Sequence, residues 1–187
     1  MEAMRVIAGS KKGHPLQAVP GKSTRPTVDK VKEAIFSMIG PYFEGGLVLD
    51  LYAGTGGLGI EALSRGAERC IFIDANRKAV HVIFQNLGTT GLRDQAEVYR
   101  NDANRALNAL KKRKLSFRIV FLDPPYAEQQ IESQIAMMID YRLLAPGAVI
   151  VAEHDAKDML CNRIGGVVKI KEVTYGQTTI TIYKNEG

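Results

Sequence analysis

The residues best suited to chemistry are Asp123-Pro124-Pro125-Tyr126, which directly follow an apolar segment at residues 119–122. The apolar segment predicts a buried strand, and two prolines end it because they remove two backbone donors and fix two φ angles. Open α/β sheets bind ligands at the carboxyl ends of their strands. A carboxylate, the Pro124 carbonyl and an aromatic ring at such an end suit a planar group with an NH2, such as a nucleobase. A turn in which the aspartate only caps the chain is the alternative.

A second candidate site lies at residues 48–59, Val-Leu-Asp-Leu-Tyr-Ala-Gly-Thr-Gly-Gly-Leu-Gly. Three of its glycines, between a predicted strand and a predicted helix, fit the nucleotide-binding pattern G-x-G-x-x-G: Gly54, Gly56 and Gly59. Asp74 ends the next predicted strand, 20 positions after Gly54, where a carboxylate accepts hydrogen bonds from ribose hydroxyls. NAD and S-adenosylmethionine sites share this motif. Asp50 favours the methyl donor, because a buried acid there can hold both the loop and a cationic amino acid end that NAD lacks.

Alternating strands and helices position these residues. The pattern predicts strands at 47–51, 71–74, 96–99, 119–122 and 148–152, and helices at 58–64, 76–87, 103–111 and 131–139. Repeated βα units predict a parallel sheet with helices on both faces. Residues 167–173 and 179–183 alternate in polarity around a Tyr-Gly-Gln turn, which predicts a closing antiparallel hairpin.

Length and composition fit one soluble globular domain, with 187 residues, 45% hydrophobic and 24% charged. No apolar run approaches the ~18 residues of a membrane span, and the N-terminus lacks a signal-peptide pattern. Cys70 and Cys161 are solitary and have no metal-ligand spacing. We therefore expect a cytoplasmic protein without a structural metal or a membrane partner.

The positive charge excess lies in the first 32 residues, which hold seven Lys or Arg against two acidic residues, whereas the remaining 155 residues hold 18 of each sign. This asymmetry indicates a polyanionic partner, most simply nucleic acid; a solvated basic tail is the alternative. Residues 5–8 and 16–19 predict a β-hairpin with lysines at its tip, and Thr27 predicts the N-cap of a helix that ends at Gly40. We predict an ordered RNA-binding arm at 1–40, packed on a domain at 41–187 in one structural unit.

The motifs together resemble a known class of enzyme. The acid and glycine loop, the acid that ends the second strand, Asn101-Asp102-Ala103 after the third and Asp-Pro-Pro-Tyr after the fourth resemble class I, Rossmann-like methyltransferases that act on amino groups. Residues 5–13, Thr24-Arg-Pro-Thr27, residues 29–34 and residues 50–66 resemble the RsmD family more specifically. Members methylate guanine N2 at one position of bacterial 16S ribosomal RNA. The resemblance runs from residue 4 to about 184. It implies a mostly parallel seven-stranded sheet with a C-terminal antiparallel hairpin.

The resemblance implies S-adenosyl-L-methionine as cofactor. The loop would pass under its methionine part, Asp50 would hold the ammonium, Asp74 would hold the ribose and Asp102 with the Ala103 N–H would hold the adenine. The full expected cofactor set is Asp50, Tyr52, Ala53, Gly54, Thr55, Gly56, Asp74, Ala75, Asp102, Ala103 and Asp123.

For catalysis, the resemblance implies that Asp123 and the Pro124 carbonyl accept hydrogen bonds from the guanine amino group, while Tyr126 stacks on a base splayed out of its helix. The expected RNA contacts are Arg5, Lys11, Lys12, Lys22, Arg25, Thr27, Pro125 and Tyr126. The expected partner is 16S rRNA within an assembled or assembling small ribosomal subunit, bound by a monomer.

Other interpretations remain open. An adenine-N6 methyltransferase of DNA or RNA can use the same four-residue motif, although its usual large target-recognition insertion has no room here. A non-catalytic RNA chaperone that binds a nucleotide and an NAD-dependent oxidoreductase are further alternatives. His14, His81 and His154 share no motif and are expected at the surface or in the core, but Glu153-His154 follows the fifth strand, where substrate contact is an alternative.

Overall fold

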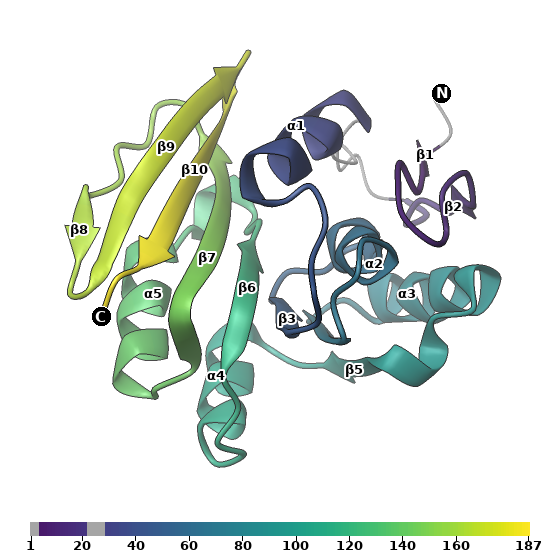
Figure 1. Cartoon of the computed structure of the whole chain (residues 1–187), viewed down its shortest axis with the longest axis horizontal. Helices are drawn as coiled ribbons and strands as arrows, with labels where there is room; N and C mark the ends of the chain where they lie inside the picture. The colour runs from purple at the N-terminus through teal and green to yellow at the C-terminus, as the bar shows by residue number, and fades with distance from the viewer. Residues whose placement is uncertain (1–3, 22–28) are drawn as a thin grey trace.

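The computed structural model describes residues 4–21 and 29–187 (Figure 1). Its helices are α1 (Asp29–Ile39), α2 (Gly57–Ser64), α3 (Arg77–Thr90), α4 (Ala103–Lys111) and α5 (Ile131–Asp140), with 3₁₀ turns η1 (Arg93–Gln95) and η2 (Tyr126–Glu128). Its strands are β1 (Met4–Arg5), β2 (Pro15–Leu16), β3 (Leu47–Asp50), β4 (Arg69–Asp74), β5 (Ala96–Arg100), β6 (Phe117–Leu122), β7 (Leu144–Asp155), β8 (Arg163–Ile164), β9 (Val167–Tyr175) and β10 (Thr178–Asn185).

One sheet organises the described residues, with the strand order β5-β4-β3-β6-β7-β10-β9-β8. The first five strands in this order are parallel, and β10, β9 and β8 continue the sheet in antiparallel fashion. The predicted α/β fold, with a mostly parallel sheet and a C-terminal antiparallel hairpin, is confirmed. The sheet has eight strands instead of seven, because two residues before β9 pair with it as β8. So short a segment has no alternation that a sequence pattern could reveal.

Two apolar cores cover the two faces of the sheet, because successive strand side chains point to opposite sides. Val48 and Phe121 face α1, α2 and α3, whereas Leu49 and Val120 face α4 and α5. Figure 1 shows the same layers, with α4 and α5 on one side and α1 to α3 on the other. No helix among the residues described is long and apolar enough to cross a membrane.

Helix α3 extends beyond its predicted end near Gly88. It runs to Thr90, and Gly91 then adopts a left-handed conformation, with φ of 71°. Gly88 faces open space, so the helix loses little by passing through it, whereas the positive φ that ends the helix falls at Gly91.

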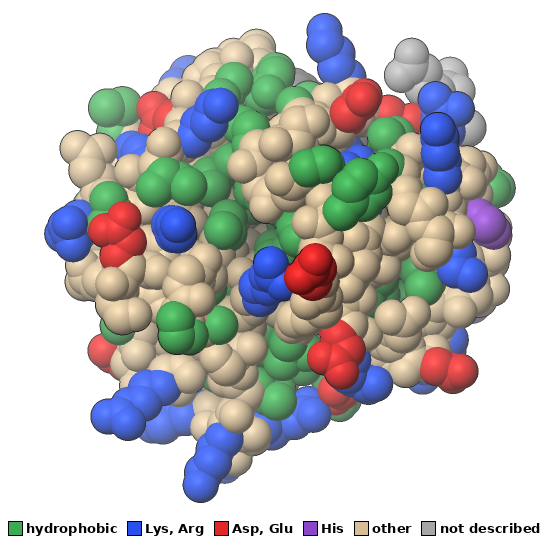
Figure 2. All heavy atoms as spheres, viewed as in Figure 1, with side chains coloured by type: hydrophobic (Ala, Val, Ile, Leu, Met, Phe, Trp, Pro, Cys, Tyr) green, Lys and Arg blue, Asp and Glu red, His purple; other side chains and the backbone are tan. Residues whose placement is uncertain are grey.

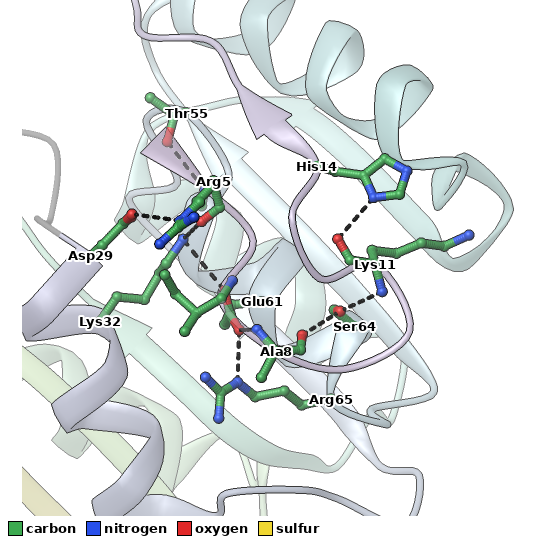
Figure 3. A network of polar contacts seen from close by, with 12 residues as sticks. Arg5, Ala8, Lys11, His14, Asp29, Lys32, Thr55, Glu61, Ser64 and Arg65 are labelled. Carbon is green, nitrogen blue, oxygen red and sulfur yellow. Dashed lines mark hydrogen bonds and ion pairs between the residues drawn. The ribbon is translucent and has the colours of Figure 1, made fainter. Parts of the chain in front are cut away.

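The short β1–β2 hairpin is held to helix α2 by buried polar contacts around Glu61 (Figure 3). The Glu61 carboxylate accepts the N–H groups of Ile7 and Ala8 at 2.9 and 3.1 Å. It also pairs with Arg65 at 2.7 Å and with Lys32 at 3.4 Å, and all three charged side chains are at least 95% buried. Burial lowers the pKa of Lys32, although Glu61 opposes the shift. Lys32, one of the seven basic residues among the first 32, is therefore part of an internal ion pair and is unavailable to a polyanion.

Candidate active site

A cavity of about 780 Å³ lies at the carboxyl ends of the central parallel strands. It brings together almost all of the predicted cofactor and catalytic residues, which are Asp50, Tyr52, Ala53, Gly54, Thr55, Asp74, Ala75, Asp102, Ala103, Asp123, Pro124 and Tyr126. Gly56 lies outside the lining, at the N-cap of α2. Strand order places Asp74 on β4 and Asp123 after β6, on either side of β3 and its glycine loop. One cavity thus joins the two motifs found in the sequence.

The three glycines of the loop have three different structural roles. Gly54 has φ of 58°, and a side chain placed there would meet nothing within 4 Å, so its backbone borders open space. Gly56 has φ of 81°, which turns the chain into α2. A Cβ at Gly59 would lie 2.4 Å from the Phe72 ring and 2.7 Å from the Cys70 sulfur, so this glycine allows α2 to approach β4. Only Gly54 is therefore placed to admit a ligand.

Asp50 holds the loop from below, because its Oδ2 accepts the Gly59 N–H at 3.1 Å. Asp50 is only 2% exposed. Burial raises the pKa of Asp50 to about 7, the nearby Asp74 adds to the rise and the bond from Gly59 opposes it. A cation in the cavity would therefore favour ionisation of this carboxyl at neutral pH.

Asp74 fixes the shape of the loop while it borders the cavity. Its Oδ2 accepts the Gly54 N–H and its Oδ1 accepts the Asn76 N–H, both at 2.8 Å. Each carboxylate oxygen has a further lone pair, so the same group can accept hydrogen bonds from two hydroxyls. Asp102 caps α4 by accepting the Arg105 N–H at 3.2 Å and also lines the cavity.

Gln134 is a buried cavity residue that the sequence analysis missed. It is 1% exposed and lies on α5, and its Nε2 donates to the Tyr52 hydroxyl at 2.6 Å and to Asn104 at 3.0 Å. Its Oε1 has no hydrogen-bond partner in the part of the chain described. A single glutamine in an amphipathic helix matches no motif, so only the fold reveals its position.

The Asp123-Pro-Pro-Tyr126 segment forms the other side of the cavity. Pro124 is buried, Tyr126 is 42% exposed, and the Tyr126 hydroxyl shares a 2.6 Å hydrogen bond with Thr178 of β10. Burial, a hydrogen bond with Glu153 and the negative charges of Glu153 and Asp50 all raise the pKa of Asp123. The tyrosine ring is thus fixed at its hydroxyl end and remains partly accessible to a flat ligand.

The predicted RNA contacts fall into three groups. Arg5 is exposed and pairs with Asp29 at 3.5 Å, while Lys11 and Lys12 lie between β1 and β2, away from the cavity lining. Lys22, Arg25 and Thr27 lie outside the described residues. Pro125 and Tyr126 line the cavity. Figure 2 shows Lys and Arg side chains beside the N-terminal hairpin and also along the lower edge, below α4, where residues 111–114 are exposed.

The arm also contributes three cavity residues that were not predicted: Met4, Leu16 and Lys32. The lysine Nζ donates to the Arg5 carbonyl at 2.6 Å, so it links the hairpin to the cavity wall. His154 is 1% exposed and its ring nitrogens bond Thr181 and the Asp155 carbonyl, which makes it a core residue.

The parallel sheet, the glycine loop and the cavity define a Rossmann-like methyltransferase fold. The family described as "Conserved hypothetical protein 95" matches residues 4–184. The chain belongs to this family, the RsmD family of methyltransferases.

Similarity to individual proteins extends over the whole chain. The Bacillus subtilis protein YlbH is 55% identical over 184 residues, which cover 98% of this chain and 100% of that protein. "Ribosomal RNA small subunit methyltransferase D" of Haemophilus influenzae is 33% identical and covers 97% of this chain and 94% of its own length. The solved structure of the Escherichia coli protein YhhF is 31% identical, with a TM-score of 0.83 over 100% of this chain and 99% of that one.

Proposed function

We propose that this protein transfers a methyl group from S-adenosylmethionine to the exocyclic N2 of a guanine in 16S ribosomal RNA. The observation that carries the proposal is the single cavity that joins the glycine loop and Asp74 to Asp123-Pro-Pro-Tyr126. Relatives such as those of Haemophilus influenzae and Escherichia coli bear the name "Ribosomal RNA small subunit methyltransferase D", which supports ribosomal RNA as the substrate.

The residues of the cavity fit the methyl donor. Gly54 leaves room for a ligand against its backbone, Asp74 offers free lone pairs for the ribose hydroxyls, and the buried Asp50 suits an ammonium group. When bound, the donor supplies a methyl group on a positively charged sulfur, which is already reactive, so positioning accounts for most of the rate.

The other side of the cavity would hold the base. Asp123 and the Pro124 carbonyl accept hydrogen bonds from the guanine amino group, which directs the nitrogen lone pair toward the methyl group and stabilises the positive charge that develops on nitrogen. Tyr126 presents a ring face held by its bond to Thr178, and stacking of this kind contributes about 1–3 kcal/mol per base. A base paired within a helix cannot enter, so the nucleotide must flip out.

The arm at residues 1–40 would bind RNA outside the cavity. Support comes from its exposed Arg5 and Lys12 and from its anchoring to α2, which fixes these charges relative to the site. Replacement of Lys11, Lys12, Lys22 and Arg25 with Ala should flatten the salt dependence of RNA binding, by about 0.7–0.9 in logarithmic slope per lost phosphate contact. An unchanged slope would mean that the arm is a solvated surface, and the exposed residues 111–114 would be tested next.

More specifically, we propose that the protein acts as a monomer on an assembled or assembling small ribosomal subunit. The arm and cavity lie on one chain, so one copy suffices to bind the RNA and the base. The test is methyl transfer from labelled S-adenosylmethionine to small subunits that lack the modification, followed by nucleoside mass analysis. We expect N2-methylguanosine with wild type and none with Asp123→Ala, whose cofactor affinity should stay within a few-fold. Labelled adenosine as the product would overturn the guanine assignment.

A further inference from the structure

Glu153 is an acidic residue of the cavity to which the proposed function assigns no role. It lies on β7, which runs parallel to β6 with Leu122 opposite Ala152. The next residues along the chain are Asp123, just after the end of β6, and Glu153, still on β7; adjacent strands of a sheet lie about 4.8 Å apart. Parallel partners in register point to the same side of the sheet, and both residues line the cavity. The register therefore places two carboxyl groups side by side where the base would bind.

The register and the shared cavity wall, together with burial and the charge and hydrogen bonding of Glu153 that raise the pKa of Asp123, indicate a hydrogen-bonded contact between the two carboxyl groups. Two carboxylates have no hydrogen between them, so this contact requires one proton in the pair. Like charges at this distance cannot both ionise readily, and the titration then belongs to the pair. Burial and the charge of Glu153 raise the pKa of Asp123, as expected for such a pair.

We infer that Glu153 is a positioning residue for methyl transfer: it shares one proton with Asp123, holds that carboxyl in place and sets the pH at which it can accept the amino hydrogens. This inference rests on the proposed function for its substrate. With the proton on Glu153, one oxygen of Asp123 accepts from Glu153 and the other is free to accept from the amino group.

The pair also gives the reaction a route for its proton. The amino nitrogen forms a bond to the methyl carbon while the methyl–sulfur bond breaks, and the sulfur keeps the electron pair of that bond. The nitrogen, now carrying an extra positive charge, loses one N–H proton to the Asp123 carboxylate. The pair then releases one proton through Glu153 to solvent, which restores its original state with charge and atoms balanced.

Other ionisable groups face the pair from the neighbouring strands and from the rest of the cavity. Asp50 on β3 adds to the rise in the pKa of Asp123. His154, the next residue on β7, bonds Thr181 and a backbone carbonyl and lies outside the cavity lining. Thr178, the residue of β10 that lines the cavity, has no ionisable side chain. The remaining ionisable residues of the cavity are Lys32, Tyr52, Asp74, Asp102, Tyr126 and Glu128.

In the active state Glu153 holds the shared proton and stabilises the Asp123 carboxylate by donating a hydrogen bond to it. Glu153→Ala removes this donor, so Asp123 should take up its proton at higher pH, and the acid limb of single-turnover methyl transfer should move up by at least one unit. Glu153→Gln should keep the limb within about half a unit. Gln can still donate to Asp123, whereas Ala cannot, so Glu153→Ala should lose at least tenfold more in kcat than Glu153→Gln. Glu186→Gln, which removes one exposed charge after β10, should keep the wild-type limb.

A second readout needs no cofactor or RNA. Carbon-13 NMR of the carboxyl groups in the free protein should show Asp123 and Glu153 responding to the same two titration steps, the upper one well above that of an ordinary carboxyl, whereas Asp123 in Glu153→Gln should titrate in a single step. An acid limb that does not move in Glu153→Ala, or an Asp123 titration that is the same in wild type and Glu153→Gln, would overturn the inference. Wild-type protein without methyl transfer would instead count against the proposed function, while the NMR titration would still decide the pairing.

Discussion

Cofactor binding should depend on pH through Asp50, and this dependence can be worked out from the structure. The carboxyl has a pKa of about 7 in the folded protein because it is buried. If only the ionised form holds the ammonium of the cofactor, it is available in about one tenth of molecules at pH 6 and nine tenths at pH 8. The affinity should then rise about tenfold over this range, with uptake of the ligand linked to release of a proton.

The variant Asp50→Asn separates the charge from the shape. The amide oxygen can still accept the Gly59 N–H, so the loop should stay in place. The pH dependence should disappear, and at pH 8 the affinity should fall by roughly 10- to 100-fold, since a charge-assisted hydrogen bond contributes about 1.5–3 kcal/mol.

The assay is isothermal titration calorimetry with S-adenosylhomocysteine, which keeps the amino acid end, at pH 6, 7 and 8 in two buffers of different ionisation enthalpy. An affinity that is flat with pH in wild type, or equally steep in Asp50→Asn, would refute the reasoning. Stability supplies an independent check of sign. The pKa of Asp50 is higher in the folded protein than the unfolded value of ~3.9, so the protonated carboxyl contributes stability that is fully present below about pH 3.9. This contribution is lost as the pH rises through about 7. The melting temperature of wild type should therefore fall more between pH 4 and pH 8 than that of Asp50→Asn.

Three further tests, two of them with a matched control substitution, address other parts of the account. Asp74→Ala should weaken S-adenosylhomocysteine binding by about 1.5–3 kcal/mol per lost charged hydrogen bond in calorimetry, and unchanged affinity would move the ribose elsewhere. Glu61→Gln should cost about 3–5 kcal/mol in urea unfolding because it leaves two buried cations without their charge partner, whereas the more exposed Glu97→Gln should cost under ~1 kcal/mol. Gly59→Ala should destabilise by about 1–3 kcal/mol through overpacking, while Gly88→Ala, with open space around it, should stabilise α3 by up to ~1 kcal/mol; equal effects would contradict the assigned packing.

Much of the fold could be predicted because hydrophobic alternation and turn residues are local signals. Asp123 and the glycine loop each follow an apolar segment, so the strands formed by these two segments were placed within a few residues. The end of α3 was placed too early because Gly88 is an exposed helix residue and Gly91 carries the positive φ. Sequence shows that both are glycines, but not which one has the left-handed conformation.

The site could be predicted where a motif names its residues, and not where neighbours come from distant segments. Asp50, Asp74 and Asp123 each end or follow a strand, so their common edge was expected. Gln134 and Lys32 reach the same cavity from helices without any motif. Lys32 was counted with the basic arm, because the sequence gives no sign that Glu61 binds it 29 positions later.

The central claim is tested most directly by mass mapping of modified nucleosides in 16S RNA from cells that lack this protein. We predict the loss of N2-methylguanosine at one position, restored by the wild-type gene and not by Asp123→Ala expressed at the same level. The variant should retain S-adenosylhomocysteine binding, which separates lost chemistry from lost folding. An unchanged set of modified nucleosides in the deletion strain, or full restoration by Asp123→Ala, would contradict the account.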